Sequence, residues 1–423
     1  MRQLNVFIND RQVGTLFEGN DIWEFQYDKQ WLEYKENYSI CPQIPLQDEK
    51  QIDGSTKRYI QWFFDNLLPE EGARTLLAQD IKADEADSFG ILAITGAESA
   101  GAITLINADS GIIDSSVHVL SSEELNARIK ELPDIPLNNK ESKRMSIAGA
   151  QHKMLIIKDG DTFLEPGGSM PSSHILKPEH SKPEQYWQTV RNEWFVMNLA
   201  HELGLNVPPT EVCYFPAAAY IIKRFDRDGN YPNQSRLHAL DGCQLLGLSR
   251  SVKYAQSSVE QLNNFSEKIR GKGAVKIAIL NWAIFNALVG NTDAHLKNLS
   301  CMVTSNGFVL APLYDLISTA IYEDGDRHLR AELSQKMGDA IRLGDLTRED
   351  ILLFGEQLGL SRIITKRQLD KMLKNIEIKA DQKIEYVERL QGIQGKAGEL
   401  RMLREIRFKM ISEMVVRLSL PAA

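Results

Sequence analysis

The sequence predicts an α+β protein with two or three domains, in which strands are concentrated in the N-terminal half and helices dominate the C-terminal half. Its 423 residues exceed what one ordinary core holds. Near the N-terminus, Leu4, Val6 and Ile8 recur at every second position, which is typical of a half-buried strand. Toward the C-terminus, apolar residues recur at the three- and four-residue spacing of a helix face: Leu369, Met372, Leu373 and Ile376.

Residues 1–110 are predicted to form a compact α+β subdomain, a size within the usual range for a domain. Asn9 and Asp10 are expected to form the turn that joins the first two strands into a hairpin. The expected strands cover residues 4–8, 13–16, 22–27 and 102–106, and the expected helices cover residues 57–68, 74–80 and 87–94.

Residues 111–143 are predicted to be a connecting helix followed by a linker. Ser121 or Ser122 can cap a short helix that continues to Ile129, with glutamates in its favourable first turn. The stretch at 133–140 contains two prolines and two asparagines, which indicates a linker.

Residues 144–236 are predicted to form a second α+β domain, and residues 237–423 are predicted to be helical almost to the end. The nearly apolar stretch 274–289 is expected to be a buried helix that presents the loop after it. A second helical stripe consists of Leu403, Ile406, Met410 and Met414. In residues 144–236 the expected strands are 153–158, 173–176, 212–215 and 219–223, and the expected helix is 186–203.

The composition is that of a cytoplasmic protein without membrane association. No signal peptide is recognisable, and no uninterrupted apolar run approaches the length of a membrane span. The four cysteines lack metal-ligand spacing, so we expect reduced, buried thiols. The net charge of -8 argues against binding of nucleic acid over the whole surface, although a local basic face or a basic partner can still bind it.

The most informative pattern is an aspartate, Asp293, followed five positions later by Asn298 and seventeen positions after that by Asp315. Protein kinases use the same three residue types in the same order at their phosphoryl-transfer centre. There the first aspartate orients the acceptor hydroxyl, while the asparagine and the second aspartate offer oxygens to Mg²⁺. The interval before Asp315 is long enough for a β-hairpin. A simple turn with an Asx cap explains the segment around Asp293 alone but not the two downstream residues, so we favour phosphoryl transfer.

His295 lies between these residues in the sequence, and two roles for it are equally compatible with the pattern. It can brace the loop, or it can contact a phosphate oxygen.

Residues 142–153 have small side chains at their centre and precede a predicted strand. Small side chains let backbone N–H groups approach a phosphate, as in glycine-rich loops. A plain turn from linker to strand is the alternative.

Lys177 ends a predicted strand, as does the kinase lysine that contacts the α- and β-phosphates and pairs with a glutamate on the next helix. Glu193 is the candidate partner, and a solvated helix residue is the alternative reading for it. Glu184 and Glu202 are less suitable, because they lie near the ends of the predicted helix.

Residues 220–226 predict a strand that continues into a hinge. The backbone of the hinge would meet adenine, and Phe225 would cover the ring. An ordinary strand end with a surface pair between Arg224 and Asp226 is nearly as compatible.

Arg367, Lys371 and Lys374 form a basic face at helical spacing that can reach DNA phosphates. A solvated helix face is the more common explanation of such a pattern.

Together these motifs resemble the HipA family, the bacterial serine/threonine kinase toxins of type II toxin–antitoxin systems. The resemblance covers essentially the whole chain. It rests on four segments: Phe63-Phe64-Asp65-Asn66-Leu67-Leu68-Pro69, Ser146-Ile147-Ala148-Gly149-Ala150-Gln151-His152-Lys153, Asn291-Thr292-Asp293-Ala294-His295-Leu296-Lys297-Asn298 and Tyr314-Asp315-Leu316.

The resemblance implies a two-lobed protein-kinase-like fold with an additional N-terminal α+β subdomain. Residues 144–236 would be the kinase N-lobe, and residues 237–423 the helical C-lobe. Asp293 would accept the proton, Asn298 and Asp315 would hold Mg²⁺, and phosphorylation of Ser146 would inactivate the enzyme. ATP contacts would come from Ala148, Gly149, Ala150, Gln151, His152, Lys153, Lys177, Lys223, Arg224, Phe225, His295, Leu296, Lys297, Asn298 and Asp315.

The implied partners are a small helix-turn-helix antitoxin that the N-terminal subdomain would dock, and operator DNA bound through that antitoxin. The implied protein substrate is an aminoacyl-tRNA synthetase, whose phosphorylation halts translation. Lys223 departs from the acidic residue expected at a kinase hinge, which bears on adenine affinity.

Two other functions are compatible with parts of the sequence. The residues Asp293, Asn298 and Asp315 would also serve a kinase-fold phosphotransferase that acts on a small-molecule hydroxyl. Alternatively, the chain acts mainly as a co-repressor module within an antitoxin–DNA complex. Phosphosites on cellular proteins would exclude the first alternative, and growth arrest that depends on the catalytic carboxylates would exclude the second.

Overall fold

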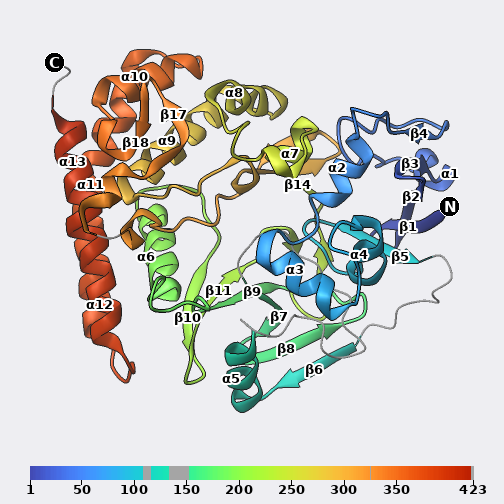
Figure 1. Ribbon diagram of the computed structural model, residues 1–423, viewed down its shortest axis with the longest axis horizontal. Helices are drawn as coiled ribbons and strands as arrows, with labels where there is room; N and C mark the ends of the chain where they lie inside the picture. The colour runs from blue at the N-terminus through green and yellow to red at the C-terminus, as the bar shows by residue number, and fades with distance from the viewer. Residues whose placement is uncertain (108–115, 133–151, 324, 421–423) are drawn as a thin grey trace. The chain divides into compact units, whose positions relative to one another are not determined.

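The computed structural model describes residues 1–107, 116–132, 152–323 and 325–420, and the chain alternates between two compact units (Figure 1). Sheets and helices are both extensive, which confirms the predicted α+β class. Unit 1 contains Met1–Pro178, Ile221–Val252 and Ser300–Ala311, and unit 2 contains Glu179–Tyr220, Lys253–Leu299 and Pro312–Ala423.

Unit 1 begins with a five-stranded antiparallel sheet in the order β4-β3-β2-β1-β5. The predicted first hairpin is confirmed, because Ile8 pairs with Arg11 across the turn. Leu4 and Val6 are fully buried, so the alternating side of β1 faces the core as predicted. The strands are β1 (Arg2–Ile8), β2 (Arg11–Gly19), β3 (Ile22–Tyr27), β4 (Gln51–Ile52) and β5 (Ile103–Asn107).

Aromatic side chains fill the core between this sheet and its helices. Phe64 packs on Phe25 and Trp23 at ring-centroid distances of 6.0 and 6.5 Å. These large rings contribute most of the apolar area that holds the subdomain together. The helices here are α1 (Lys29–Glu33), α2 (Tyr59–Asp65), α3 (Glu71–Asp80) and α4 (Ser88–Thr95).

A second sheet in unit 1 has the strand order β11-β9-β7-β8-β6. The helix that follows β6 begins as predicted, since Ser121 forms a complete capping box with Glu124. The sequence did not predict β8, which contains Pro166 and ends with Gly167. The elements are β6 (Ser116–Leu120), α5 (Ser122–Glu131), β7 (Met154–Asp159), β8 (Thr162–Gly167), β9 (His174–Pro178) and β11 (Ala218–Lys223), and the boundary between the units falls within β11.

The prediction that the chain is helical beyond Leu237 is wrong for several segments. Short strands pair there because their long-range partners supply the backbone hydrogen bonds, which a local periodicity cannot reveal. In unit 1 these strands are β14 (Ala239–Asp241), β15 (Ser300–Thr304) and β16 (Gly307–Leu310). The other elements of unit 1 in this part of the chain are β12 (Arg227–Asp228), β13 (Ser235–Arg236), α7 (Gly242–Leu246) and η1 (Arg250–Val252).

Unit 2 is mainly helical. Besides its helices it holds β10, which lies next to β11, and a separate hairpin of β17 and β18. Its elements are α6 (Thr189–Glu202), β10 (Thr210–Tyr214), α8 (Val259–Lys268), α9 (Lys272–Val289), η2 (Leu296–Asn298), η3 (Ala320–Tyr322), η4 (Gly325–Arg330), β17 (Glu332–Met337), β18 (Ala340–Arg342), η5 (Leu343–Asp345), α10 (Arg348–Gln357), α11 (Arg362–Arg389), α12 (Lys396–Glu405), η6 (Ile406–Ile411) and α13 (Ser412–Ser419).

Helix α9 is the central core helix of unit 2, as predicted. Trp282, Ile284 and Phe285 are fully buried on different sides of the helix. Among the described residues α9 is also the one helix long and apolar enough to cross a membrane, although Lys276, Asn281 and Asn286 interrupt its apolar run. Because 61% of it is buried inside the protein, its apolar character is accounted for by core packing.

The two C-terminal stripes are buried as predicted. Leu369 and Ile376 of α11 are fully buried, as are Leu403, Met410 and Met414 further on. Figure 1 shows α12 and α13 as one continuous helix, joined by the π-helical turn η6. A π-helical turn holds one extra residue, which rotates the residues after it around the helix axis. The apolar stripe therefore stays on the same side of the helix before and after η6.

Candidate active site

The loop after α9 starts at a position that only glycine fits. Gly290 has φ +67°. A Cβ atom there would collide with the end of the Met410 side chain and lie 3.2 Å from the Cβ of Ala320. The carbonyl of Gly290 accepts hydrogen bonds from the N–H groups of Thr319 and Ala320 at 3.1 and 2.9 Å. The chain therefore leaves α9 in a fixed direction.

Hydrogen bonds on both sides hold Asp293 in place. The side-chain amide of Asn291 donates to Asn286 Oδ1 at 2.9 Å, and Asn291 Oδ1 in turn accepts from the Asp293 N–H at 3.0 Å. The next residue, Ala294, donates its N–H to Ser334 Oγ at 2.8 Å. Asp293 itself is partly exposed. The loop is therefore rigid where the carboxylate is attached, and the carboxylate remains accessible.

Asn298 and Asp315 meet although seventeen residues separate them. Asn298 Nδ2 donates to Asp315 Oδ2 at 3.2 Å, and the neighbouring Tyr314 hydroxyl donates to the carbonyl of Lys297 at 2.6 Å. The hairpin predicted between the two residues in the sequence is confirmed as β15 and β16. Asp293, Asn298 and Asp315 all lie in unit 2.

The Asn298–Asp315 pair has the donor chemistry of a magnesium site. Its oxygens are hard ligands, and Mg²⁺ at phosphate sites is held by one or two carboxylates together with phosphate and water oxygens. No group of three or more His, Cys, Asp or Glu residues in the described ranges is arranged to hold a metal, and this mode of binding does not require one. Asp315 also has φ +60°, an uncommon conformation for a residue with a side chain. Such conformations cluster at functional sites.

His295 is braced against an aromatic ring. It is 7% exposed, and the Tyr254 ring meets it edge-on at 4.9 Å and 79°. The Tyr254 hydroxyl donates to Asp293 Oδ1 at 2.5 Å. Of the two roles expected for His295, these contacts favour bracing of the loop.

Glu193 belongs to the same region of unit 2. It is 1% exposed on α6, so the alternative of a solvated helix residue is wrong. Burial raises the pKa of the Tyr220 hydroxyl well above its usual value, and the charges of Glu193 and Asp315 raise it further. Both carboxylates therefore lie within electrostatic reach of one phenol. Glu202 instead pairs with Lys383 at 2.9 Å, and Glu184 is exposed.

Apart from Asp315, the described residues among the predicted nucleotide contacts outside the catalytic loop lie in unit 1. Lys177 is a buried residue of β9, whereas Lys223 is exposed at the end of β11. His152, Lys153 and Phe225 are partly buried. The predicted contacts Ala148, Gly149, Ala150 and Gln151 and the predicted phosphorylation site Ser146 lie outside the described residues.

Arg224 is part of a buried arginine cluster, so the reading of a surface pair with Asp226 is wrong. Its guanidinium bonds Asp226 at 2.7 and 2.9 Å and Glu98 at 3.0 Å. Arg227 and Arg236 also bond Glu98. Burial alone would raise the pKa of Glu98, but the three guanidinium groups hold it far below its usual value. An adenine contact at Arg224 would therefore use the main chain. Because its N–H donates to the Ser173 carbonyl at 2.9 Å, that contact would be through its own carbonyl oxygen.

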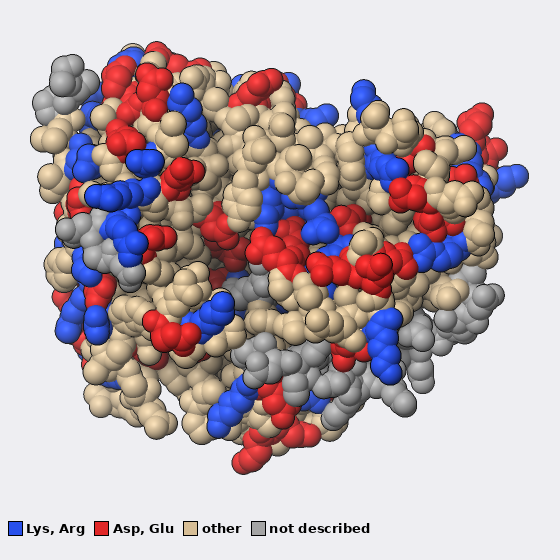
Figure 2. All heavy atoms as spheres, viewed as in Figure 1, with Lys and Arg blue, Asp and Glu red and all other residues tan. Residues whose placement is uncertain are grey.

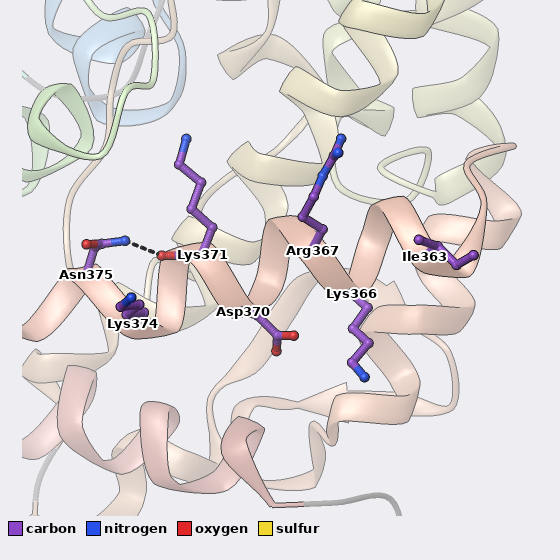
Figure 3. Close-up of a pocket in the computed structure, with 7 residues that line it drawn as sticks. All are labelled: Ile363, Lys366, Arg367, Asp370, Lys371, Lys374 and Asn375. Carbon is purple, nitrogen blue, oxygen red and sulfur yellow. Dashed lines mark hydrogen bonds between the residues drawn. The ribbon is translucent and has the colours of Figure 1, made fainter.

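The predicted basic face is exposed on α11 (Figure 3). Arg367 and Lys371 extend to the same side of the helix, and Lys374 follows one turn later. These residues line a shallow, open groove together with Ile363, Lys366, Asp370 and Asn375.

Tyr254, Ser334 and Thr319 were not predicted to belong to the site. Thr319 Oγ1 accepts from the Thr292 N–H at 2.7 Å, so it supports the loop just as Ser334 does. Tyr254 precedes Asp293 by 39 residues, and its place in the sequence carries no motif. The bonds that bring these three residues to the loop depend on the packing of unit 2, which no spacing in the sequence records.

Two family models together match most of the chain. The model described as "HipA N-terminal domain" matches residues 4–106, and the model described as "HipA-like C-terminal domain" matches residues 145–384. The second match includes all three residues of the Asp293–Asn298–Asp315 set.

Relatives in both sequence and structure agree with these matches. The "Serine/threonine-protein kinase toxin HipA" of Shewanella oneidensis is 30% identical over 395 residues, which are 88% of this chain and 87% of that protein. A solved structure described as the "Shewanella oneidensis MR-1 Toxin Antitoxin System HipA, HipB and its operator DNA complex" matches with a TM-score of 0.82 and 27% identity, covering 98% of this chain and 97% of that one. The predicted kinase-like fold with an additional N-terminal subdomain is thereby confirmed, and the chain belongs to the HipA family.

Proposed function

We propose that this protein is a serine/threonine-protein kinase toxin that transfers the γ-phosphate of ATP to a protein hydroxyl. The observation that carries the proposal is the rigid loop of unit 2, which offers a partly exposed carboxylate at Asp293 beside the Asn298–Asp315 contact of 3.2 Å. A relative that is 30% identical bears the name of such a kinase.

In the proposed reaction Asp293 orients the acceptor hydroxyl and receives its proton. The acceptor oxygen attacks the γ-phosphorus as the bond from that phosphorus to the β,γ-bridging oxygen breaks, and ADP leaves. A general base of this kind contributes about 10²–10⁴-fold to a rate. The hydrogen bond from the Asp293 N–H to Asn291 Oδ1 fixes where the carboxylate is attached, so little orientation is lost in the transition state.

Asn298 and Asp315 would hold Mg²⁺ through their side-chain oxygens. Bound there, the ion would neutralise charge on the β- and γ-phosphates. The unusual backbone of Asp315, with φ +60°, supports this role, since such conformations cluster at functional sites.

Further nucleotide contacts are proposed from residues outside the catalytic loop. We propose contacts from Ala148–Lys153, from Lys177 on the α- and β-phosphates, and from the hinge Lys223–Phe225 on adenine. The burial of Glu193 and its electrostatic link to Asp315 through Tyr220 support it as the partner of Lys177.

We further propose that Ser146 is autophosphorylated and that this inactivates the kinase. A phosphate would add about -1.5 to -2 charge at pH 7 beside the phosphates of ATP. Phosphopeptide mapping after incubation with Mg-ATP tests the assignment, because incorporation only at other residues would contradict it.

The proposed partners are a small helix-turn-helix antitoxin and, through it, operator DNA, as in the complex of the Shewanella relative. Figure 2 shows acidic and basic side chains interspersed on the visible face, which agrees with the net charge of -8 and disfavours DNA binding by the chain alone. Arg367, Lys371 and Lys374 would add phosphate contacts within the complex. The protein substrate is proposed to be an aminoacyl-tRNA synthetase, met in the cytoplasm.

The kinase proposal is tested with purified protein, labelled ATP and Mg²⁺. Asp315→Asn is expected to remove transfer to protein, because an amide replaces the carboxylate at the metal position. Asp345→Asn, a change of the same chemistry in a short 3₁₀ turn of unit 2, is the control and should retain activity. Equal transfer by wild type and Asp315→Asn would contradict the site.

The DNA proposal is tested by gel shifts at fixed salt concentration. The complex with antitoxin is expected to bind operator DNA, and changing Arg367, Lys371 and Lys374 to Gln should weaken it modestly and reduce the salt dependence. Tight, sequence-selective binding by the isolated chain would contradict the proposed division of roles.

A further inference from the structure

Tyr254 places a hydroxyl group directly on the carboxylate proposed as the catalytic base. Its Oη lies 2.5 Å from Asp293 Oδ1. The residue is in a turn just before α8, within the same unit as the catalytic loop. Nothing in the Asp293–Asn298–Asp315 pattern requires a tyrosine there, so the contact calls for its own explanation.

The contact resembles the one that an acceptor hydroxyl must make. A serine or threonine substrate would donate its O–H to Asp293 before transfer, and the phenol makes such a donation in the unliganded protein. A hydrogen bond from a neutral hydroxyl to a carboxylate is about twice as strong as one between neutral groups.

The ring of Tyr254 is supported but not enclosed. Its edge contact with His295 and the Lys253 ammonium 5.0 Å from the ring centroid orient it over the loop. At the same time the residue is 49% exposed, so the ring can turn into solvent without opening a cavity in the core. These two features fit a group that covers Asp293 until another hydroxyl displaces it.

We propose that Tyr254 is a specificity-determining residue that caps Asp293 and selects a protein hydroxyl over water as the phosphate acceptor. The proposal rests on the kinase function proposed above. Water has only its own hydrogen bond with which to displace the phenol. A protein acceptor is held by the rest of its surface, so its hydroxyl reaches Asp293 at a high effective concentration and displaces the phenol more readily.

The reaction that the cap suppresses is hydrolysis of ATP. In that reaction a water oxygen attacks the γ-phosphorus, the bond to the β,γ-bridging oxygen breaks, and the water proton passes to Asp293. The products are ADP and inorganic phosphate, so futile turnover is measured without any protein acceptor.

Tyr254→Phe is the decisive variant, because it keeps the ring against His295 and removes only the hydroxyl. Two assays are compared: phosphate release from ATP without acceptor, and transfer to dephosphorylated casein as a generic serine-containing probe. Phosphate release is expected to rise about tenfold, the factor that corresponds to 1.4 kcal/mol. The KM for casein is expected to fall, with kcat little changed. Tyr386→Phe is the matched control, since that tyrosine of α11 is 51% exposed.

Other outcomes overturn the proposal in recognisable ways. If Tyr254→Phe lowers kcat for casein and leaves phosphate release unchanged, Tyr254 instead positions Asp293 for transfer. If neither assay changes, the contact has no role in the reaction. If wild type and Asp293→Asn turn over ATP equally, the kinase site itself is misassigned and the role of Tyr254 falls with it.

Discussion

The arginine cluster of unit 1 and the catalytic loop of unit 2 both concentrate polar and charged side chains, but they use them in opposite ways. In the cluster, Glu98 is fully buried and bonds three guanidinium groups. In the loop, Asp293 is partly exposed, and its main chain is held because the N–H groups of Asp293 and Ala294 donate to Asn291 Oδ1 and Ser334 Oγ. The first arrangement neutralises its charge internally, whereas the second keeps a carboxylate available to a substrate.

This difference separates structural charge from functional charge in the molecule. The resemblance implied Arg224 as a nucleotide contact at a hinge whose backbone would meet adenine. The Arg224 guanidinium is committed to Asp226 and Glu98. The Arg224 guanidinium, enclosed with its partners, is a structural charge, whereas Asp293 is held by its loop and stays partly exposed.

The largest expected effect is on catalysis, and it tests the loop. Asp293→Asn should lower the rate of phosphate transfer by about 10²–10⁴-fold, because it removes the general base. Its melting temperature should change little, since the main-chain bonds that hold the loop remain. Initial rates with labelled ATP check the predicted loss of transfer, and a thermal melt of the same preparation checks the predicted melting temperature. A large loss of stability would show that Asp293 belongs with Glu98 as a structural charge.

The next effect is on stability, and it tests the cluster. Glu98→Gln should lower the free energy of unfolding by about 3–5 kcal/mol, because it leaves buried guanidinium groups without their shared counter-charge. Denaturant unfolding checks this, with Glu385→Gln as the matched control. Glu385 pairs with Arg389 on an exposed turn of α11, where such a pair contributes little. If both changes had an equally small effect, the buried Glu98 would stabilise the protein no more than an exposed ion pair does.

A buried histidine extends the comparison to a group that is kept neutral. Burial lowers the pKa of His238 to about 4, although its ring nitrogen Nε2 lies 2.7 Å from the Ile40 carbonyl, which favours the charged form. Nδ1 has no hydrogen-bond partner within the part of the chain that the structure describes. The unfolded chain takes up a proton at the ordinary pKa near 6.5, and the folded chain does not. Stability should therefore fall as the pH drops from about 6.5 to about 4.

The expected loss approaches about 3 kcal/mol at the low end of this range, since each pKa unit corresponds to about 1.4 kcal/mol. Unfolding curves at pH 7.5, 6 and 5 for wild type and His238→Asn measure it. The difference between the two proteins should shrink as the pH falls. A constant difference would mean that His238 is protonated in the folded protein.

The smallest expected effect concerns a polar network on the surface. Ser121 and Glu124 form a capping box at the start of α5, where Ser121 is exposed and Glu124 is partly exposed. Ser121→Ala should lower stability by about 1 kcal/mol, because one N-terminal N–H loses its acceptor. Thermal melts measure it, with Ser122→Ala, the first residue inside the helix, as the control. A loss of stability as large as that of Glu98→Gln would contradict the view that the burial of a polar group determines how much its removal destabilises the protein.

Local sequence patterns predicted the helices and strands that depend on the spacing of neighbouring residues in the chain. The alternation of Leu4, Val6 and Ile8 predicted β1, and the stripe on α11 predicted its buried face, because side-chain period follows directly from backbone geometry. Helix α9 was predicted from a nearly apolar stretch, 274–289, that is long enough for a buried helix. The strands β14, β17 and β18 were missed, since a short strand is defined by a distant partner and carries little periodicity of its own.

The sequence by itself determined which residues would carry the proposed chemistry, since the order and spacing of Asp293, Asn298 and Asp315 follow a pattern that needs no tertiary information to be read. Only the tertiary structure decided what surrounds them: Tyr254 on Asp293, Ser334 behind the loop, the burial of Glu193, and the enclosure of Arg224 with Glu98. The physical reason is that hydrogen bonds and desolvation act over a few ångströms in space, whatever the separation in sequence. A residue 39 or 126 positions away can therefore decide the state of a charge that its own neighbours in the chain do not touch.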